Sequence, residues 1–116
     1  MFEAENIRDW RDHDVVDLEG RKIGSLESVY VDTVTDQPAF AAVTVGLPTR
    51  KRLIFVPLEK AVVAPAHVKV AWPRQQVKDA PSIDTDGELL AEQEREVFAH
   101  YGLDYGTGSA RRLARR

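Results

Sequence analysis

The sequence predicts a mainly β fold, a small antiparallel β-barrel of five to six strands followed by a C-terminal α-helix. Three observations support this prediction. Residues 23–58 hold three apolar segments joined by two polar turns. Two of these segments are apolar on both alternating faces, so neither can leave one side in water. In the remaining segment, the first of the three in the chain, the alternation of apolar and polar residues changes beside a glycine. Such a change is typical of a β-bulge in a bent strand. A curled sheet whose outer face is covered by another element accounts for all three.

The three strands differ in their apolar pattern. In residues 22–32 the period of two is broken between Ile23 and Leu26, beside Gly24, and again before Val29. Residues 39–45 and 52–58 alternate regularly. We expect four residues of this region and of the last strand, or their neighbours of opposite parity, in the core: Val43, Leu53, Phe55 and Val70.

The flanking segments complete the barrel. Residues 17–20 (DLEG) have the composition of a hairpin turn after a first strand at Val15 and Val16. Residues 62–64 and 68–72 predict a final hairpin. Residues 74–81 are expected to form a polar crossing with a single apolar anchor, Val77. Near the N-terminus, Ile7 and Trp10 are expected to plug one end of the barrel.

The C-terminal part predicts a helix from about Leu89 to Tyr101, ended by Gly102. One face of this helix is the candidate interaction surface, formed by Leu90, Glu94, Val97, Phe98 and Tyr101. Two interpretations of Glu94 stay open. Its carboxylate lies at the edge of the apolar stripe in water, or it meets a basic partner from the barrel or from another subunit.

The chain divides into three predicted parts. Residues 1–80 form the barrel domain and residues 81–103 form the helical extension. Residues 104–116 are predicted to be a disordered basic tail, because glycines and arginines there leave little to pack. The apolar runs are far shorter than the roughly twenty residues of a membrane span. The N-terminus has no signal-peptide pattern. We therefore expect a cytoplasmic protein without a transmembrane segment.

The residues that commonly carry chemistry do not form a recognisable site. The chain has no cysteine, which excludes a disulfide, a thiolate metal site and a thiol nucleophile. No pair of histidines has metal-ligand spacing. The aspartates at 12, 14, 17, 32 and 36 are interpreted as solvated turn residues, whereas a general acid needs burial to raise its pKa. We predict no catalytic residue, no cofactor and no metal, and hence no enzyme.

Two function classes remain. The first is a protein-interaction module whose surplus apolar surface is hidden in a homodimer. The alternative is an RNA- or anionic-surface-binding protein. Its candidate anion contacts are Arg50, Lys51, Arg52, Arg111, Arg112, Arg115 and Arg116. No aromatic residues interleave with these cations and the rest of the chain is acidic, which favours the interaction module.

Three motifs in order resemble the PRC-barrel family. They are residues 17–24 (DLEGRKIG), residues 29–32 (VYVD) before a polar turn with Pro38, and residues 55–58 (FVPL). The similarity covers about residues 6–80. Residues 77–81, 86–89 and 100–103 further resemble bacterial members with one barrel and a helical extension, although Asp36 and Leu90-Ala91 depart from the common pattern.

The resemblance implies a small β-barrel used as a non-catalytic adaptor with protein partners. Named relatives occur in the photosynthetic reaction centre H subunit and in a ribosome maturation factor. No functional residue is carried over from either. This chain lacks the membrane helix of the H subunit, and it lacks the second domain of the maturation factor.

Overall fold

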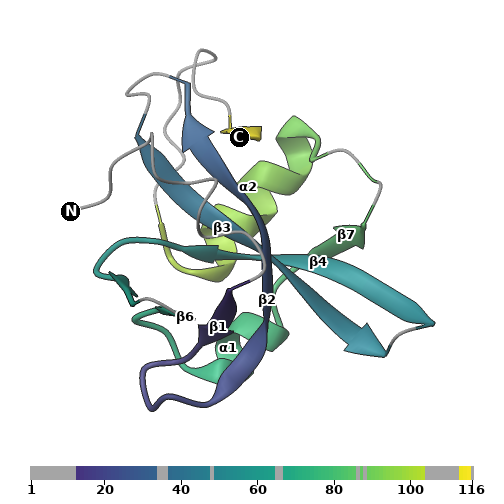
Figure 1. The fold of residues 1–116 in the computed structure, drawn as a ribbon. Helices are drawn as coiled ribbons and strands as arrows, with labels where there is room; N and C mark the ends of the chain where they lie inside the picture. Colours follow the sequence, from purple (N-terminus) through teal and green to yellow (C-terminus); the bar gives the residue numbers. More distant parts are fainter. Residues whose placement is uncertain are drawn as a thin grey trace.

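The computed structural model describes residues 13–33, 37–47, 49–64, 67–85, 87, 89–103 and 113–115. Its elements are β1 (Asp14–Val16), β2 (Lys22–Asp32), β3 (Pro38–Leu47), β4 (Arg50–Pro57), β5 (Val62–Val63), β6 (His67–Lys69), α1 (Arg74–Lys78), β7 (Ser82–Asp84), α2 (Ala91–His100) and β8 (Leu113–Arg115) (Figure 1). The predicted plug of Ile7 and Trp10 lies outside the described residues.

The strands form one curled sheet in the order β5-β6-β1-β2-β3-β4-β7. Strands β1 to β4 are an antiparallel meander, and β6 pairs with β1 in parallel. The predicted mainly β fold with a C-terminal helix is confirmed. The described residues form eight strands rather than five or six, because β7 pairs with β4 and β8 pairs with the part of β2 that β1 leaves open. The described end strands β5 and β7 do not pair, so the sheet is curled without being closed.

Strand β2 bends where the sequence predicts it to. Its register shifts opposite β1, where Val15 pairs with Gly24 and Val16 with Lys22. A second shift, opposite β3, falls between Leu26 and Ser28. A Cβ at Gly24 would collide with the carbonyl oxygen of Thr44, so only glycine allows β2 and β3 to approach this closely. Because β2 bends, this one long strand pairs with β1 near its start and with β8 near its end.

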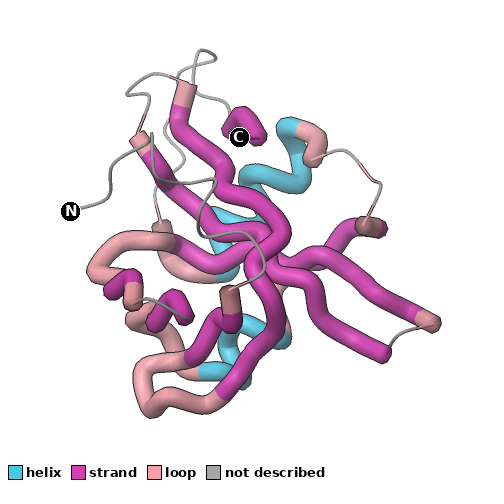
Figure 2. The backbone as a smooth tube through the Cα atoms, in the orientation of Figure 1, coloured by secondary structure: helices cyan, strands magenta, loops and turns pink. Residues whose placement is uncertain are grey.

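The two faces of the sheet form two separate cores. Alternation sends Ile54 and Val56 of β4 to the concave core, and Leu53 and Phe55 to the outer core. Helix α2 covers the outer core, where it lies across the sheet in Figure 2. The four residues expected in the core, Val43, Leu53, Phe55 and Val70, are all buried. The sequence therefore predicted correctly that both faces are covered.

Helix α2 starts and stops for local reasons. At its start the Leu90 N–H donates a hydrogen bond to Gln93 Oε1 at 2.9 Å. At its end Gly102 has φ of +68°, and the Leu103 N–H donates to the Phe98 carbonyl oxygen at 2.8 Å. The Tyr101 hydroxyl donates to the Phe55 carbonyl oxygen at 2.6 Å, which fixes the helix end on β4.

Two segments differ from the sequence prediction. The expected polar crossing contains α1, because buried Val77 anchors one face of this short helix. Residues 113–115 are not disordered. They form β8 against β2, and the Leu113 side chain is buried in the outer core. The other residues of the predicted tail lie outside the described part of the chain.

Candidate interaction site

The apolar stripe of α2 is used inside the chain. Val97, Phe98 and Tyr101 are buried against the barrel, and the Phe98 ring lies 5.0 Å from that of Phe40. Only Leu90 of the predicted surface is well exposed, at 53%. The prediction that this stripe is offered to a partner is therefore corrected, because the apolar outer face of the sheet takes it up instead.

Glu94 does not lie in water at the edge of the stripe. Its side chain is fully buried, and its Oε1 accepts a hydrogen bond from the Leu113 N–H at 3.2 Å. Strand β8 lies against the Glu94 carboxylate and helps to bury it. The pattern of the helix alone does not include β8, so it does not predict that Glu94 is buried. Glu94 thus joins α2 to the C-terminal strand.

The surplus apolar surface behind the homodimer prediction is mostly covered by the chain. The exposed large apolar side chains of the described residues are Leu18, Val62 and Leu90. They lie on three separate elements: the β1–β2 turn, β5 and the start of α2. Single exposed apolar residues of this kind are ordinary on a protein surface. The homodimer stays a prediction.

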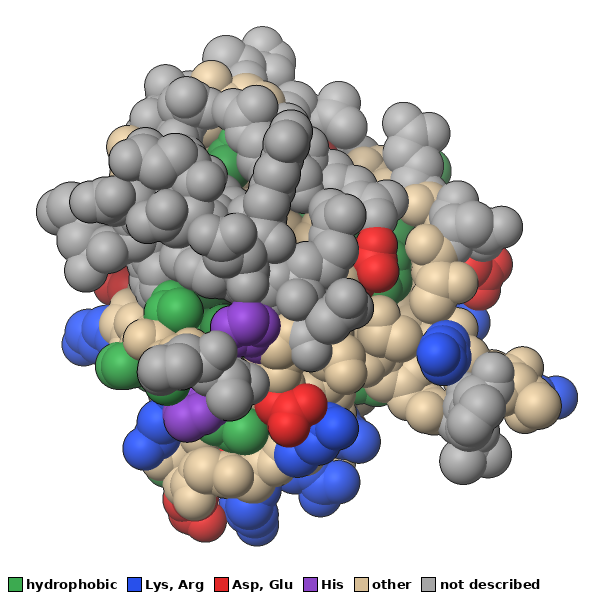
Figure 3. Space-filling view, viewed as in Figure 1, with side chains coloured by type: hydrophobic (Ala, Val, Ile, Leu, Met, Phe, Trp, Pro, Cys, Tyr) green, Lys and Arg blue, Asp and Glu red, His purple; other side chains and the backbone are tan. Residues whose placement is uncertain are grey.

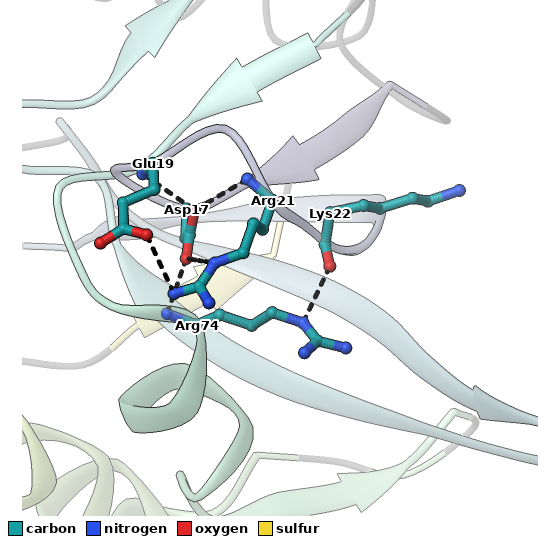
Figure 4. Close-up of polar contacts among 5 residues, drawn as sticks. All are labelled: Asp17, Glu19, Arg21, Lys22 and Arg74. Atoms are coloured by element: carbon teal, nitrogen blue, oxygen red, sulfur yellow. Dashed lines mark hydrogen bonds and ion pairs between the residues drawn. The ribbon is translucent and has the colours of Figure 1, made fainter.

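The Asp17 carboxylate accepts four hydrogen bonds from described residues. Its Oδ1 accepts the N–H groups of Glu19 at 2.9 Å and Arg21 at 2.8 Å (Figure 4). Its Oδ2 accepts the Arg74 N–H and Arg21 Nε, each at 3.2 Å. The Asp17 side chain is fully buried, so its interpretation as solvated is wrong. Asp32, with 9% exposure, is also buried.

The hydrogen bonds to Asp17 decide its protonation state. Burial by itself raises the pKa of this carboxyl, but three backbone N–H groups and the Arg21 guanidinium outweigh burial and hold the pKa below its ordinary value of 3.8. Asp17 is therefore a carboxylate at neutral pH. It ties the β1–β2 turn to the first residue of α1 and so fixes the helix against β2.

A hollow of about 650 Å³ lies beside this junction. Its walls come from the start of β2, the end of β3, the start of β4, and α1. Four cationic side chains line it, and we call it the basic groove: Lys22, Lys51, Arg74 and Lys78. Among the described residues that line it, Glu27 is the one carboxylate. In Figure 3 Lys and Arg side chains gather over the lower part of the molecule, where β2 and α1 meet in Figure 1.

The four cations of the basic groove differ in how firmly they are held. Lys22 Nζ pairs with Asp14 Oδ1 at 3.2 Å. Arg74 Nε donates to the Lys22 carbonyl oxygen at 3.1 Å, which draws the guanidinium along β2 (Figure 4). Lys51 and Lys78 form no ion pair with any described residue. The groove thus keeps unneutralised positive charge on a chain whose net charge is −3.

The predicted cluster at 50–52 is divided by strand alternation. All three side chains are exposed near the tip of the β3–β4 hairpin, which reaches beyond the rest of the sheet (Figure 1). Lys51 faces the basic groove. Arg52 instead donates to Ser82 Oγ at 2.7 Å and pairs with Asp84 Oδ1 at 3.2 Å. The other predicted cations, Arg111, Arg112 and Arg116, lie outside the described residues, as does the side chain of Arg115.

Sequence reasoning missed three of the groove cations. Lys22, Arg74 and Lys78 come together with Lys51 only when α1 docks against β2. A signal existed in residues 73–78 (PRQQVK): Arg74 and Lys78 are four apart, which places them on one face of a helix that begins after proline.

The part of the chain that the structure describes contains neither a metal-binding cluster nor a membrane-spanning helix. No three His, Asp or Glu side chains of the described residues are placed so that they could hold a metal ion together. His100 Nε2 lies 2.6 Å from the Gln76 carbonyl oxygen, a contact that joins α2 to α1. Neither described helix is long and apolar enough to cross a membrane.

Comparison with known proteins agrees with this architecture. A family model described as PRC-barrel domain matches residues 2–71, which contain β1 to β6. None of the curated proteins matches the chain. The division at 81–103 and 104–116 stays a prediction. Domains of this kind are in general interaction modules without catalytic activity. Since the match spans more than half of the sequence and contains the DLEGRKIG, VYVD and FVPL motifs, the chain belongs to the PRC-barrel family.

Proposed function

We propose that the protein is a non-catalytic adaptor that binds an acidic segment of a partner protein in the basic groove. The observation that carries the proposal is the meeting of four cations around one hollow, two of them without an ion pair to a described residue. Unpaired positive charge in a concave site attracts carboxylates, because the walls limit screening by water. A short acidic segment fits a hollow of about 650 Å³.

The lining of the groove favours an acidic protein segment over nucleic acid. None of the described residues that line it is aromatic, so they offer bases no surface on which to stack. The described aromatic rings gather in the outer core instead. The net charge of −3 also repels a long polyanion, whereas a short acidic segment meets only the local positive field.

The acidic residues agree with a binding role rather than catalysis. Asp17 is committed to four hydrogen bonds and stays ionised, so it does not serve as a general acid at neutral pH. RNA or another anionic surface remains the alternative partner, through residues 50–52 at the hairpin and the arginines of residues 111–116. The cytoplasmic location stays a prediction.

Reversing two groove charges tests the proposal. We expect the double variant Lys51→Glu/Lys78→Glu to bind a short labelled polyglutamate peptide at least about tenfold more weakly than the wild type, or about 1.4 kcal/mol. The reason is that two attractive charges become repulsive within one hollow. Fluorescence anisotropy at low and physiological salt measures the change, and salt should weaken wild-type binding.

A matched control separates the groove from net charge. Lys60→Glu/Lys69→Glu changes the charge equally at exposed positions outside the groove. This variant should keep most of the affinity for the peptide. Equal losses in both double variants would show that only net charge matters. Tighter binding of a single-stranded RNA of equal charge, lost in the groove variant, would favour the alternative.

A further inference from the structure

The C-terminal strand occupies an edge of β2 that the meander leaves open. Strand β3 lies along one edge of β2, and β1 covers only the first part of the other edge. Strand β8 continues that second edge, with Leu113 opposite Asp32 and Arg115 opposite Tyr30. In Figure 1 β8 lies beside the end of β2 that is far from β1. The segment therefore acts as an added strand.

The place that β8 fills is shaped for an extended segment. The Leu113 side chain is buried in the outer core, together with Tyr30 and Phe98. The Leu113 N–H donates to Glu94 Oε1 at 3.2 Å, and Glu94 is fully buried. We call this arrangement the strand site: the β2 edge at residues 30–32, the hollow filled by Leu113, and Glu94.

The hold on β8 is small in extent. Its three residues pair with β2, and no other described strand pairs with it. Leu113 is its one side chain that the structure describes as buried. Residues 104–112 join β8 to the end of α2, and this connection contains Gly106 and Gly108. A short strand on a glycine-containing connection can exchange with a segment that makes the same bonds.

We propose that the strand site is a docking site for an extended segment of a partner protein, a leucine flanked by basic residues, and that the chain's own C-terminus occupies it when the partner is absent. Addition of a strand to a sheet edge takes its affinity from backbone hydrogen bonds and its specificity from side-chain hollows. Here the hollow selects leucine.

Charge selects the flanking residues. Glu94 and Asp32 place two buried carboxylates at the strand site. The chain's own segment, RRLARR, surrounds Leu113 with four arginines. A basic partner segment in the strand site would lie beside these two carboxylates. The strand site lies at one end of β2 and the basic groove lies at the other end. The strand site favours a basic segment, whereas the basic groove favours an acidic one. The two binding sites are therefore independent of each other.

The test adds the C-terminal segment in trans to the full chain. A labelled peptide with the sequence of residues 106–116 is titrated into wild type and into Leu113→Asp, whose own segment no longer fits the apolar hollow. We expect the variant to bind at least about tenfold more tightly. In the wild type the tethered segment competes at an effective concentration on the order of millimolar.

Three controls make the result specific. A peptide with serine in place of leucine keeps its charge and should lose binding to Leu113→Asp. Adding Glu94→Gln to that variant should weaken binding about tenfold, because a hydrogen bond to a charged acceptor is replaced by one to a neutral acceptor. Adding Lys51→Glu/Lys78→Glu should not weaken it, which separates the strand site from the basic groove.

Circular dichroism checks that each variant is folded. If Leu113→Asp does not fold, Leu113→Ala replaces it in the same comparison. Equal binding of the peptide to wild type and to the opened variant would overturn the proposal. So would an absence of binding, or binding that does not depend on the leucine of the peptide.

Discussion

Replacement of Phe55 by alanine is expected to lower the free energy of unfolding by about 3–5 kcal/mol. The Phe55 side chain is fully buried in the outer core, between the sheet and α2. Its ring meets that of Tyr30 edge to face at a centroid distance of 5.2 Å. The backbone of β4 cannot close the cavity, because it is paired with β3. Since small domains have about 5–15 kcal/mol of stability, much of the population would unfold under mild denaturant.

Urea unfolding followed by circular dichroism measures this loss. Leu90→Ala is the control, because Leu90 belongs to the predicted apolar stripe of α2, which covers this core, but is itself half exposed. It should change the free energy of unfolding by no more than about 0.5 kcal/mol. If Phe55→Ala were as mild as the control, the outer face would not be a packed core and the covering role of α2 would be wrong.

Replacement of Asp17 by alanine is the second large effect that we expect, with a loss of about 3–5 kcal/mol. Three backbone N–H groups, those of Glu19, Arg21 and Arg74, lose their carboxylate acceptor. The turn and the start of α1 then come apart, which also deforms the basic groove. Asp14→Ala is the control. Its carboxylate is half exposed in the pair with Lys22, and its loss should cost about 0–1 kcal/mol.

The stabilising effect of Asp17 should depend on pH with a defined sign. The pKa of Asp17 is lowered on folding, so its contribution is fully present above the unfolded value near 3.8 and is lost as pH falls through the lower folded value. The difference in unfolding free energy between wild type and Asp17→Asn should therefore be constant above about pH 5 and shrink in strong acid. A difference that does not change with pH would mean that Asp17 is not held as a carboxylate.

The sequence was sufficient for the elements that carry their own pattern. The bend of β2 follows from broken alternation beside Gly24, and the covered outer face follows from apolar residues on both sides of β4. The end of α2 follows from Gly102, whose positive φ suits glycine. These features depend on neighbours in sequence, which is why they could be predicted.

The missed elements depend on contacts between distant residues. Helix α1, β7 and β8 are short, and each has one buried large apolar residue: Val77, Ile83 and Leu113. A single apolar residue gives no period, so only the tertiary structure decides these segments. The burial of Asp17 and Glu94 was missed for the same reason. One donor to each carboxylate is distant in the sequence: Arg74 lies 57 residues from Asp17, and Leu113 lies 19 residues from Glu94.

Purification of tagged protein from its native cells tests most directly whether the basic groove holds an acidic protein partner. Wild type, Lys51→Glu/Lys78→Glu and Lys60→Glu/Lys69→Glu are compared at equal expression. We predict a protein that co-purifies in stoichiometric amount with wild type and with the second variant, is lost from the groove variant, and binds the purified adaptor through an acidic segment. Identical sets of proteins with all three chains would contradict the claim.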